Sequence, residues 1–400
     1  MSRRPLLMIP GPVEVSPAVL EAASGPPPSH LAPDLLAAFG DALRAMRLLW
    51  KASADSQPFV VGGGGTLAME AAATNLLAPG ERALVVVTGF FGERMAEMLR
   101  RRGVEVGAVA AEPGEAPPLT EVESVLERAV LERRRYKVLF ATHVDTSTGV
   151  RTDPAPLAAL ARRFDVISVF DGVCATAGER FEMASWDADL YFTASQKAIG
   201  LPPGLALWVA GPRALEARRT LAAPPPLTLD FDSWRPVMEA YEEGRTAYFS
   251  TPATTLVRAL ATGLAELLGE PGAKDPAMAV DAVVGRHERA AAALRAAWRE
   301  LGLEPVPGRD ALAANTLSAL RYPEGKGNEI LGAIRDRGVI VAGALHPALL
   351  GRSFRVGHMG HVTRNAEPLE RTIEAIAGAL GTESRAALDA FRASWESGAA

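Results

Sequence analysis

The sequence predicts an α/β protein in which a mainly parallel sheet is sandwiched by helices. Between residues 59 and 210, short apolar runs typical of buried strands alternate with segments of helical spacing. Two of these runs, residues 166–170 and 188–193, stop at polar side chains, Asp171 in the first case and Gln196 and Lys197 in the second. In an open parallel sheet, ligands bind at the carboxyl ends of the strands. These polar residues are therefore candidates for a binding site.

The elements are expected in the following order. An extended arm covers residues 1–15, and Asp34 is a possible cap for the first long helix. Thr120 and Glu123 have the spacing of a capping box, and Asp153 and Pro154 suit the start of a further helix. Strands are expected at 59–61, 83–87, 104–109, 137–142, 166–170, 188–193 and 205–210, helices at 34–51, 66–77, 93–102 and 254–268, and irregular structure at 223–244.

A domain boundary is expected at residues 270–276, which contain two prolines, a glycine and charges of both signs. It separates a large domain, residues 16–269, from a smaller α+β domain, residues 270–400. The smaller domain is expected to contain a long helix at 277–301 and short strands at 339–341 and 354–356.

Composition excludes several classes of protein. Of the 400 residues, 22% are charged and 48% hydrophobic, which excludes wholesale disorder, and a net charge of −5 leaves no footprint for nucleic acid or an anionic membrane. The single cysteine, Cys174, excludes an internal disulfide and suits a reducing compartment. No apolar run is long enough for a signal sequence or a membrane span. A cytoplasmic protein is expected.

Asp171 and Lys197 are the first candidate pair. The intervening segment is long enough for one crossover, so both side chains are expected to face the same crevice. A lysine amine can form a Schiff base with an aldehyde, and a carboxylate can keep the ring nitrogen of pyridoxal phosphate protonated. A buried ion pair or two surface charges would give the same pattern.

Residues 62–65 are four consecutive glycines that precede an expected helix. Such a loop lets backbone N–H groups approach a phosphate at the helix N-terminus, and the hydroxyl of Thr66 can add to them. Gly63, Gly65 and Ala68 also fit a dinucleotide-binding pattern, but the following strand does not end in the acidic residue that this pattern requires. A flexible turn without a ligand remains the alternative.

Together these features resemble the class V aminotransferases of the alanine–glyoxylate and serine–pyruvate group, which have the fold-type I architecture of pyridoxal-phosphate enzymes. The resemblance covers nearly the whole chain, from PGPVEVSPAVLEA at residues 10–22 to FRVGHMG at 354–360. Its most specific segments lie in this order: GGTLAMEAA, HVDTSTG, VFDGV, SQKA followed by PPG, YFSTP and RVGHMG.

The resemblance implies a role for each matching position. Lys197 would be the Schiff-base lysine and Asp171 the partner of the pyridine nitrogen. Phe91 and Val173 would pack on the two faces of the ring, and Thr146 would lie near its edge. The phosphate would be held by Gly64, Gly65, Thr66 and Gln196 and, across a homodimer interface, by Tyr248 and Thr251; Arg355 and Gly11 would bind substrate. The chain departs from the family in having Phe91 for Trp and Gly64 for Ser.

The expected activity is transfer of an amino group from alanine or serine to glyoxylate or pyruvate. The alternatives are another amino donor, such as ureidoglycine or aminoethylphosphonate, and a cysteine desulfurase-like lyase, for which Cys174 lies in the wrong place. A cofactor-binding regulator would need a further DNA-binding domain, for which the arm has no room. Without the resemblance, Arg355 could be a surface residue and Cys174 a packing residue. His143, His358 and His361 have no metal-binding spacing, and no metal is expected.

Overall fold

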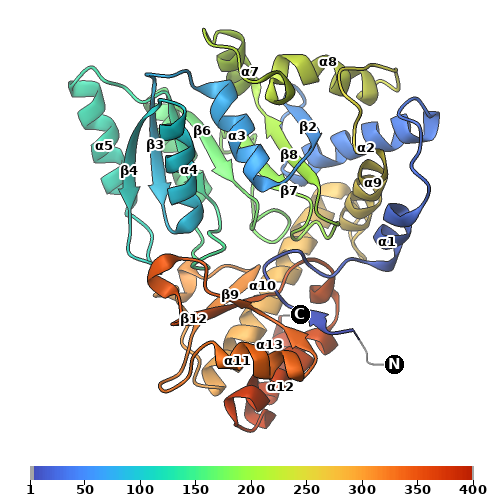
Figure 1. Ribbon diagram of the computed structural model, residues 1–400, viewed down its shortest axis with the longest axis vertical. Helices are drawn as coiled ribbons and strands as arrows, with labels where there is room; N and C mark the ends of the chain where they lie inside the picture. The colour runs from blue at the N-terminus through green and yellow to red at the C-terminus, as the bar shows by residue number, and fades with distance from the viewer. Residues whose placement is uncertain (1–3, 399–400) are drawn as a thin grey trace.

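The computed structural model describes residues 4–398. Within these residues, seven strands form the central sheet in the order β2-β8-β7-β6-β5-β3-β4 (Figure 1). Their bounds are β2 Gln57–Gly62, β3 Arg82–Val87, β4 Glu105–Ala110, β5 Val138–Thr142, β6 Ile167–Asp171, β7 Leu190–Ala194 and β8 Leu205–Ala210. The mainly parallel sheet expected from the sequence is confirmed.

One strand of the sheet is reversed. β8 pairs antiparallel with β7 on one side and with β2 on the other, whereas β3 to β7 pair in parallel. Because β8 is flanked by two antiparallel pairings, β2 runs in the same direction as β7. The carboxyl ends of β2, β3, β5, β6 and β7 therefore share one edge, and the glycine loop after β2 lies at the same edge as Asp171.

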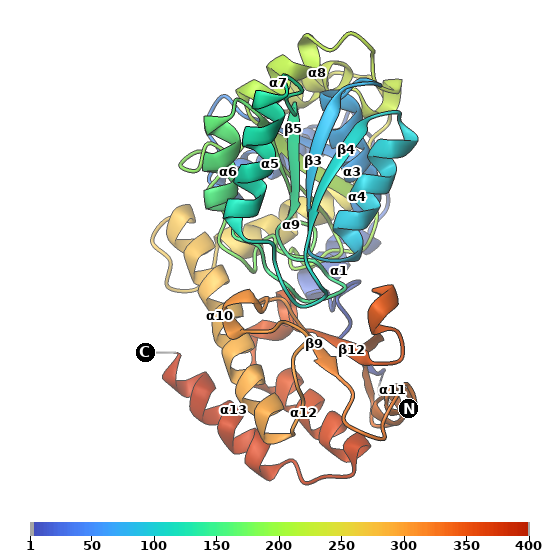
Figure 2. The ribbon, with the colours of Figure 1, turned by 90° about the vertical axis from the view of Figure 1, so that its left-hand side faces the viewer.

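Helices cover both faces of this sheet. Figure 2 shows α3 and α4 on one face and α5 and α6 on the other. The helices of this part of the chain are α1 Pro17–Ser24, α2 Pro33–Leu49, α3 Gly65–Leu76, α4 Phe90–Arg101, α5 Leu119–Leu131, α6 Pro154–Arg163, α7 Pro212–Arg219, α8 Phe231–Glu242 and α9 Thr254–Leu268.

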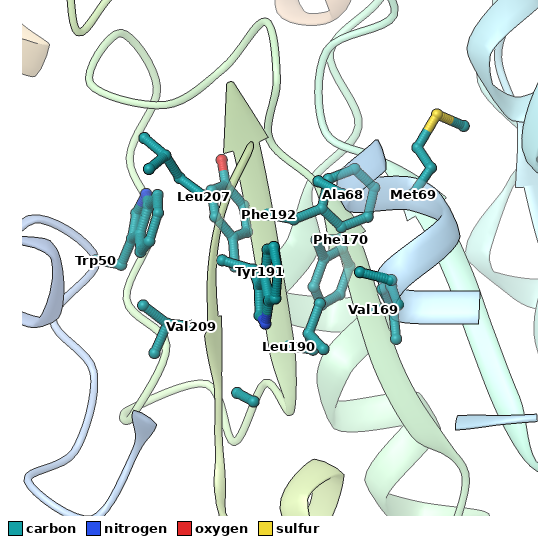
Figure 3. Packing of buried hydrophobic residues seen from close by; sticks show 14 of the residues in the cluster. Trp50, Ala68, Met69, Val169, Phe170, Leu190, Tyr191, Phe192, Leu207 and Val209 are labelled. Carbon is teal, nitrogen blue, oxygen red and sulfur yellow. The ribbon is translucent and has the colours of Figure 1, made fainter. Parts of the chain in front are cut away.

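Alternating side chains of β7 join the sheet to its two helical layers. Figure 3 shows Phe192 directed towards Ala68 and Met69 of α3, whereas Tyr191 lies on the side of Trp50, with 5.5 Å between the ring centroids. Tyr191 and Phe192 are fully buried. This core fixes β6 and β7, and thereby the loops that follow them.

The C-terminal part has a second core. A three-stranded sheet in the order β11-β12-β9 packs with α10, α12 and α13, and the buried residues include Leu294, Phe354, Val356, Ile373 and Phe391. The elements are α10 Pro276–Glu300, β9 Leu317–Arg321, α11 Glu329–Asp336, β10 Val339–Ile340, β11 Ala342–Gly343, β12 Ser353–Gly357, α12 Ala366–Leu380 and α13 Arg385–Ser397. The domain boundary at residues 270–276 stays a prediction.

The N-terminal arm runs between the sheet and this second core (Figure 1). Its short strand β1, Leu6–Leu7, pairs in parallel with β10, and Met8 is buried in the C-terminal core. Residues 1–3 of the expected arm and residues 399–400 of the expected small domain lie outside the described residues. None of the helices in residues 4–398 combines the length and the apolar character that crossing a membrane requires.

Three local predictions were wrong. Asp34 does not cap α2, because the helix begins at Pro33 after Ala32, and Asp34 lies in the first turn. Thr120 and Glu123 form no capping box, because α5 begins at Leu119 after Pro118, two residues earlier than a cap at Thr120 requires. Residues 223–244 are not irregular throughout, because α8 forms despite Pro236, held by an N-cap bond in which Asp230 accepts from the N–H of Asp232. The cap at Asp153 is confirmed, since its carboxylate accepts from Ala155 at 3.2 Å.

Candidate active site

Asp171 and Lys197 lie at the expected edge of the sheet. Asp171 is the last residue of β6, and its Oδ1 accepts a hydrogen bond from the N–H of Val173 at 2.9 Å. Burial raises the pKa of Asp171 to about 7, and the nearby charge of Lys197 opposes this rise. A buried carboxylate with this pKa favours a cationic partner that would restore its ionised form.

Lys197 lies in the loop after β7 with only 9% of its surface exposed. Burial lowers its pKa, and the charge of Arg355 acts in the same direction. Its Nζ donates to the carbonyl oxygen of Pro10 in the N-terminal arm. A lysine amine whose pKa is lowered in this way is more available as a nucleophile at neutral pH.

Gly11 shows how tightly the arm packs against this lysine. It has a φ of +97°, and a Cβ at this position would lie 2.7 Å from Cδ of Lys197 and 2.9 Å from the carbonyl oxygen of Gln196. Both the backbone conformation and the available space therefore require glycine. The arm is thus one wall of the site.

The glycine loop and the loop after β6 meet at the start of α3. A Cβ on Gly65 would lie 2.9 Å from Cγ2 of Val173, so the bare backbone allows this contact. Gly64 is the N-cap of α3 and has no side chain to bond the first N–H groups of the helix, which leaves them for an anion. Thr66 follows in the first turn of α3. The structure therefore places Gly64, Gly65, Thr66 and Val173 together.

Gln196 contributes a buried polar atom to the same region. Its Oε1 is buried and finds no hydrogen-bond partner within residues 4–398. An unsatisfied buried amide oxygen is costly, and such atoms often mark a place where a ligand or water bonds. The hydroxyl of the neighbouring Ser195 already has partners within the protein, because it donates to the carbonyl of Pro202 at 2.8 Å and accepts from the N–H of Leu205 at 3.2 Å.

Phe91 is held by the loop that follows β5. Its backbone N–H donates to Oδ2 of Asp145 at 2.9 Å, and Ser147 binds the preceding N–H, that of Phe90, at 3.0 Å. A Cβ on Gly89 would lie 2.6 Å from the carboxyl carbon of Asp145, so the loop can approach only because this residue is glycine. Burial raises the pKa of Asp145, and these hydrogen bonds oppose the rise.

Arg355 reaches the same loop from the C-terminal part of the chain. It lies on β12 between Phe354 and Val356, both fully buried in the C-terminal core, so alternation turns its side chain to the other face, as predicted. Its Nε donates to the carbonyl of Gly343 at 2.9 Å and its Nη1 to that of Thr146 at 3.3 Å. Burial lowers the pKa of Arg355. The guanidinium is therefore anchored by backbone carbonyls at the edge where Lys197 lies.

Two predicted site residues are not brought into this group. Tyr248 is 65% exposed, and its hydroxyl lies 3.4 Å from that of Thr251, in the segment between α8 and α9. They are expected to act in a partner subunit, and their exposure is consistent with that role.

Two of the remaining histidines have structural partners. Nδ1 of His143 lies 3.0 Å from the hydroxyl of Tyr191, and Nε2 of His358 lies 2.9 Å from that of Ser318. Burial lowers the pKa of both histidines to about 3, so they are neutral at physiological pH. His361 is half-buried, and burial lowers its pKa also. Cys174 is buried beside Thr316, and no cluster of potential metal ligands occurs in the described part of the chain.

The chain was compared with known proteins on the basis of sequence. Residues 29–223 match the family described as aminotransferase class-V. The chain is 32% identical over 380 residues to alanine–glyoxylate aminotransferase 1 of Saccharomyces cerevisiae, covering 88% of this chain and 91% of the relative. The chain belongs to the class V aminotransferases. It is also 31% identical to L-aspartate–glyoxylate aminotransferase of Paracoccus denitrificans, covering 89% of this chain and 87% of the relative.

The fold agrees with this assignment. The crystal structure of an alanine–glyoxylate aminotransferase from Nostoc sp. superposes with a TM-score of 0.84 at 27% identity, covering 95% of this chain and 96% of the other. The chain is therefore a fold-type I, pyridoxal-phosphate-dependent transaminase. The residues present fit this cofactor, since Gly64 has no side chain to cap the N–H groups at the start of α3, and these are donors for its phosphate end.

Sequence reasoning missed three parts of the site. Asp145 lies in the HVDTSTG segment, which pointed to a polar loop but gave no sign that its carboxylate holds Phe91. The carbonyl of Pro10 has no sequence signal, because any residue could supply it. Glu179 was also missed; it follows the Asp171 strand and has the type of a solvated surface residue, yet it is 3% exposed.

Proposed function

We propose that this transaminase takes an amino group from a small amino acid, alanine or serine, and passes it to glyoxylate or pyruvate. The observation that carries the proposal is the joint position of Lys197, which is buried, and Arg355, which is half-buried at the same edge and close enough for its charge to lower the pKa of the amine. A small amino acid has little apolar surface to bury, so its carboxylate must orient it. A guanidinium suits this carboxylate through its bidentate fork.

The site residues take the following roles in this proposal. Pyridoxal phosphate supplies an electron sink that stabilises negative charge at the substrate α-carbon. Lys197 holds the cofactor through Nζ and then moves the α-proton, and Asp171 keeps the pyridine nitrogen protonated. Phe91 and Val173 flank the ring, Thr146 lies at its edge, and Gly11 borders the substrate. The phosphate is bound by Gly64, Gly65, Thr66 and Gln196, and by Tyr248 and Thr251 of a second subunit.

A homodimer is part of the proposal. Tyr248 is a large, mostly exposed aromatic residue. Further exposed apolar side chains are Leu227, Leu20 of α1, Leu48 of α2 and Leu31 in the turn between these two helices. Exposed apolar surface of this kind is typical of a subunit interface. The cytoplasmic location expected from the composition stays a prediction.

The donor and acceptor are tested with purified protein that carries its cofactor. Alanine, serine, aspartate, ureidoglycine, aminoethylphosphonate and cysteine are added one at a time, and the change in the visible spectrum gives the rate of the first half-reaction. The rates of the second half-reaction with glyoxylate and with pyruvate are then compared. Alanine or serine should react with the highest kcat/KM. A higher value for aspartate, ureidoglycine or aminoethylphosphonate contradicts the assigned donor.

The desulfurase alternative is tested in the same experiment. Formation of alanine from cysteine, with sulfide released when a thiol reductant is added, would support it, and transamination of cysteine would not. The position of Cys174 argues against a sulfur-accepting role, because its side chain is 1% exposed and burial raises its pKa.

A further inference from the structure

Glu179 is a buried carboxylate just beyond the loop that follows Asp171. The segment from Gly172 to Glu179 is a series of consecutive turns, in which Thr176 N donates to Gly172 O and Glu179 N to Ala175 O, both at 2.8 Å. The position of Glu179 is therefore rigidly tied to the end of β6.

Both oxygens of Glu179 bind Asn315. The backbone N–H of Asn315 donates to Oε1 at 2.5 Å, and its side-chain Nδ2 donates to Oε2 at 2.8 Å. The next residue adds two contacts to the same run: Thr316 donates its hydroxyl proton to the carbonyl of Cys174 at 2.7 Å, and a Cβ on Gly178 would lie 2.2 Å from its methyl group. Residues 315–316 are thus fixed on the run that follows β6.

The loop after β5 joins at the same carboxylate. Nη1 of Arg151 lies 3.4 Å from Oε2 of Glu179, and the backbone N–H of Arg151 donates to Leu312 O at 2.7 Å. Ala314 N in turn donates to Gly149 O at 3.0 Å. Glu179 therefore lies where three segments meet: residues 172–179, residues 149–151 and residues 311–316.

These segments lead directly to Arg355. Thr316 precedes β9, whose Ala319 lies opposite Arg355 in the antiparallel register. His358, just after β12, donates its backbone N–H to Thr316 O at 2.9 Å. Nη1 of Arg355 donates to the carbonyl of Thr146, which lies in the loop that Arg151 closes. Glu179 consequently supports both sides of Arg355 without touching it.

We propose that Glu179 is a positioning residue for the substrate: by joining the start of β9 to the loop that carries Thr146, it sets where the Arg355 guanidinium meets the substrate carboxylate. The inference rests on the proposed function of Arg355.

A carboxylate is needed at this position because it faces only donors. Asn315 presents two N–H groups and Arg151 a guanidinium, so both oxygens must accept. A glutamine would turn an NH₂ group towards one of these donors and leave buried donors unpaired. Burial raises the pKa of Glu179 to about 7 while Arg151 opposes the rise, which shows that this buried acid is costly to maintain.

The test is Glu179→Gln in the protein with its cofactor bound. The KM for the amino donor and for the 2-oxo acid should each rise by about tenfold, which corresponds to about 1.4 kcal/mol. The cofactor spectrum should stay the same. The rate with a primary amine that lacks a carboxylate should change by less than about threefold. Asn315→Ala, which keeps the backbone donor, should show the same pattern with a smaller rise, and it keeps the test possible if Glu179→Gln does not fold.

Glu242→Gln is the matched control. Glu242 also binds an arginine, Arg47, at 2.7 and 3.0 Å, but it lies at the end of α8 and touches no segment that leads to Arg355. It should leave both KM values unchanged. Equal losses for the amine and the carboxylate substrates in Glu179→Gln would mean a general structural role, and unchanged KM values would overturn the inference while leaving the proposed function intact. A wild-type protein that transaminates no α-amino acid would overturn both.

Discussion

The backbone N–H of Phe91 donates a hydrogen bond of 2.9 Å to Oδ2 of Asp145. The two residues lie in the first turn of α4 and in the loop after β5, which follow neighbouring parallel strands, β3 and β5. The other oxygen of Asp145 accepts from the N–H and the hydroxyl of Ser147, at 2.9 and 2.5 Å. Asp145 therefore fixes the backbone of Phe91, which is proposed to flank the cofactor ring. All the hydrogen-bond partners of the Asp145 carboxylate are donors.

Asp145→Asn should weaken the binding of pyridoxal phosphate by about tenfold or more, because an amide NH₂ must face one of these donors and displace Phe91. Fluorescence titration of the cofactor-free protein measures the change. Asp153→Asn is the control, since Asp153 caps α6 with a similar bond to Ala155, away from the site. Equal affinity in the wild type and Asp145→Asn would show that Phe91 does not depend on this bond.

Reduction with borohydride should attach the pyridoxyl group to Lys197. This lysine is buried and has a lowered pKa, whereas Lys137, the comparison residue, forms an ion pair with Glu81 at 2.7 Å. Peptide mapping after reduction locates the label. Lys197→Ala should bind the cofactor without a covalent link and lose transamination. A label on any other lysine would contradict the assignment.

Asp171 should make the cofactor-free protein less stable as the pH rises. Its folded pKa of about 7 lies above its ordinary value of 3.8, so the fold favours the protonated acid. The resulting stabilisation is complete below about pH 4 and is lost as the pH rises through about 7. Between these limits the wild type should lose on the order of 3 kcal/mol more than Asp171→Asn, measured by urea unfolding. If the free energy of unfolding depends on pH in the same way in both proteins, Asp171 does not titrate in this range.

Arg355→Lys should raise the KM for the amino donor and the 2-oxo acid alike, because it keeps the charge but loses the bidentate geometry. Arg355→Ala should lose about 2–5 kcal/mol of transition-state binding. The measurement compares kcat/KM for alanine, serine and glyoxylate with that for an amine lacking a carboxylate. The amount of cofactor attached to Lys197 serves as the control and should not change. If the amine loses as much as the carboxylate substrates, Arg355 is not their anchor.

Mixing two inactive variants should restore activity if the sites are shared between subunits. Lys197→Ala supplies intact Tyr248 and Thr251, and a double variant at these two positions supplies an intact Lys197, so one of the two sites in a mixed dimer is complete. Activity after subunit exchange, proven by mass spectrometry of differently tagged chains, gives the answer. Absence of activity in proven mixed dimers would place the whole site within one chain.

The predictable features were those with a local signal. Asp171 and Lys197 end apolar runs, and the glycines precede a helix, so their common edge follows from the rules of parallel sheets. The arm at Lys197 and the bond from Phe91 to Asp145 join distant segments, and no local pattern indicates them. α8 was missed because Pro236 usually marks the end of a helix, whereas here it lies inside one. Its packing in the core outweighs the lost hydrogen bond, with Trp234, Met238 and Tyr241 buried.

The pairing of β1 with β10 has a consequence for biosynthesis. Leu6 and Leu7 are synthesised long before their partners Val339 and Ile340. The arm that contacts Lys197 through Pro10 can therefore dock on its partner strand only after β10 has been synthesised. The central sheet can form earlier, since domains generally fold as units during synthesis. The pocket wall formed by the arm is therefore completed only after β10 has been synthesised.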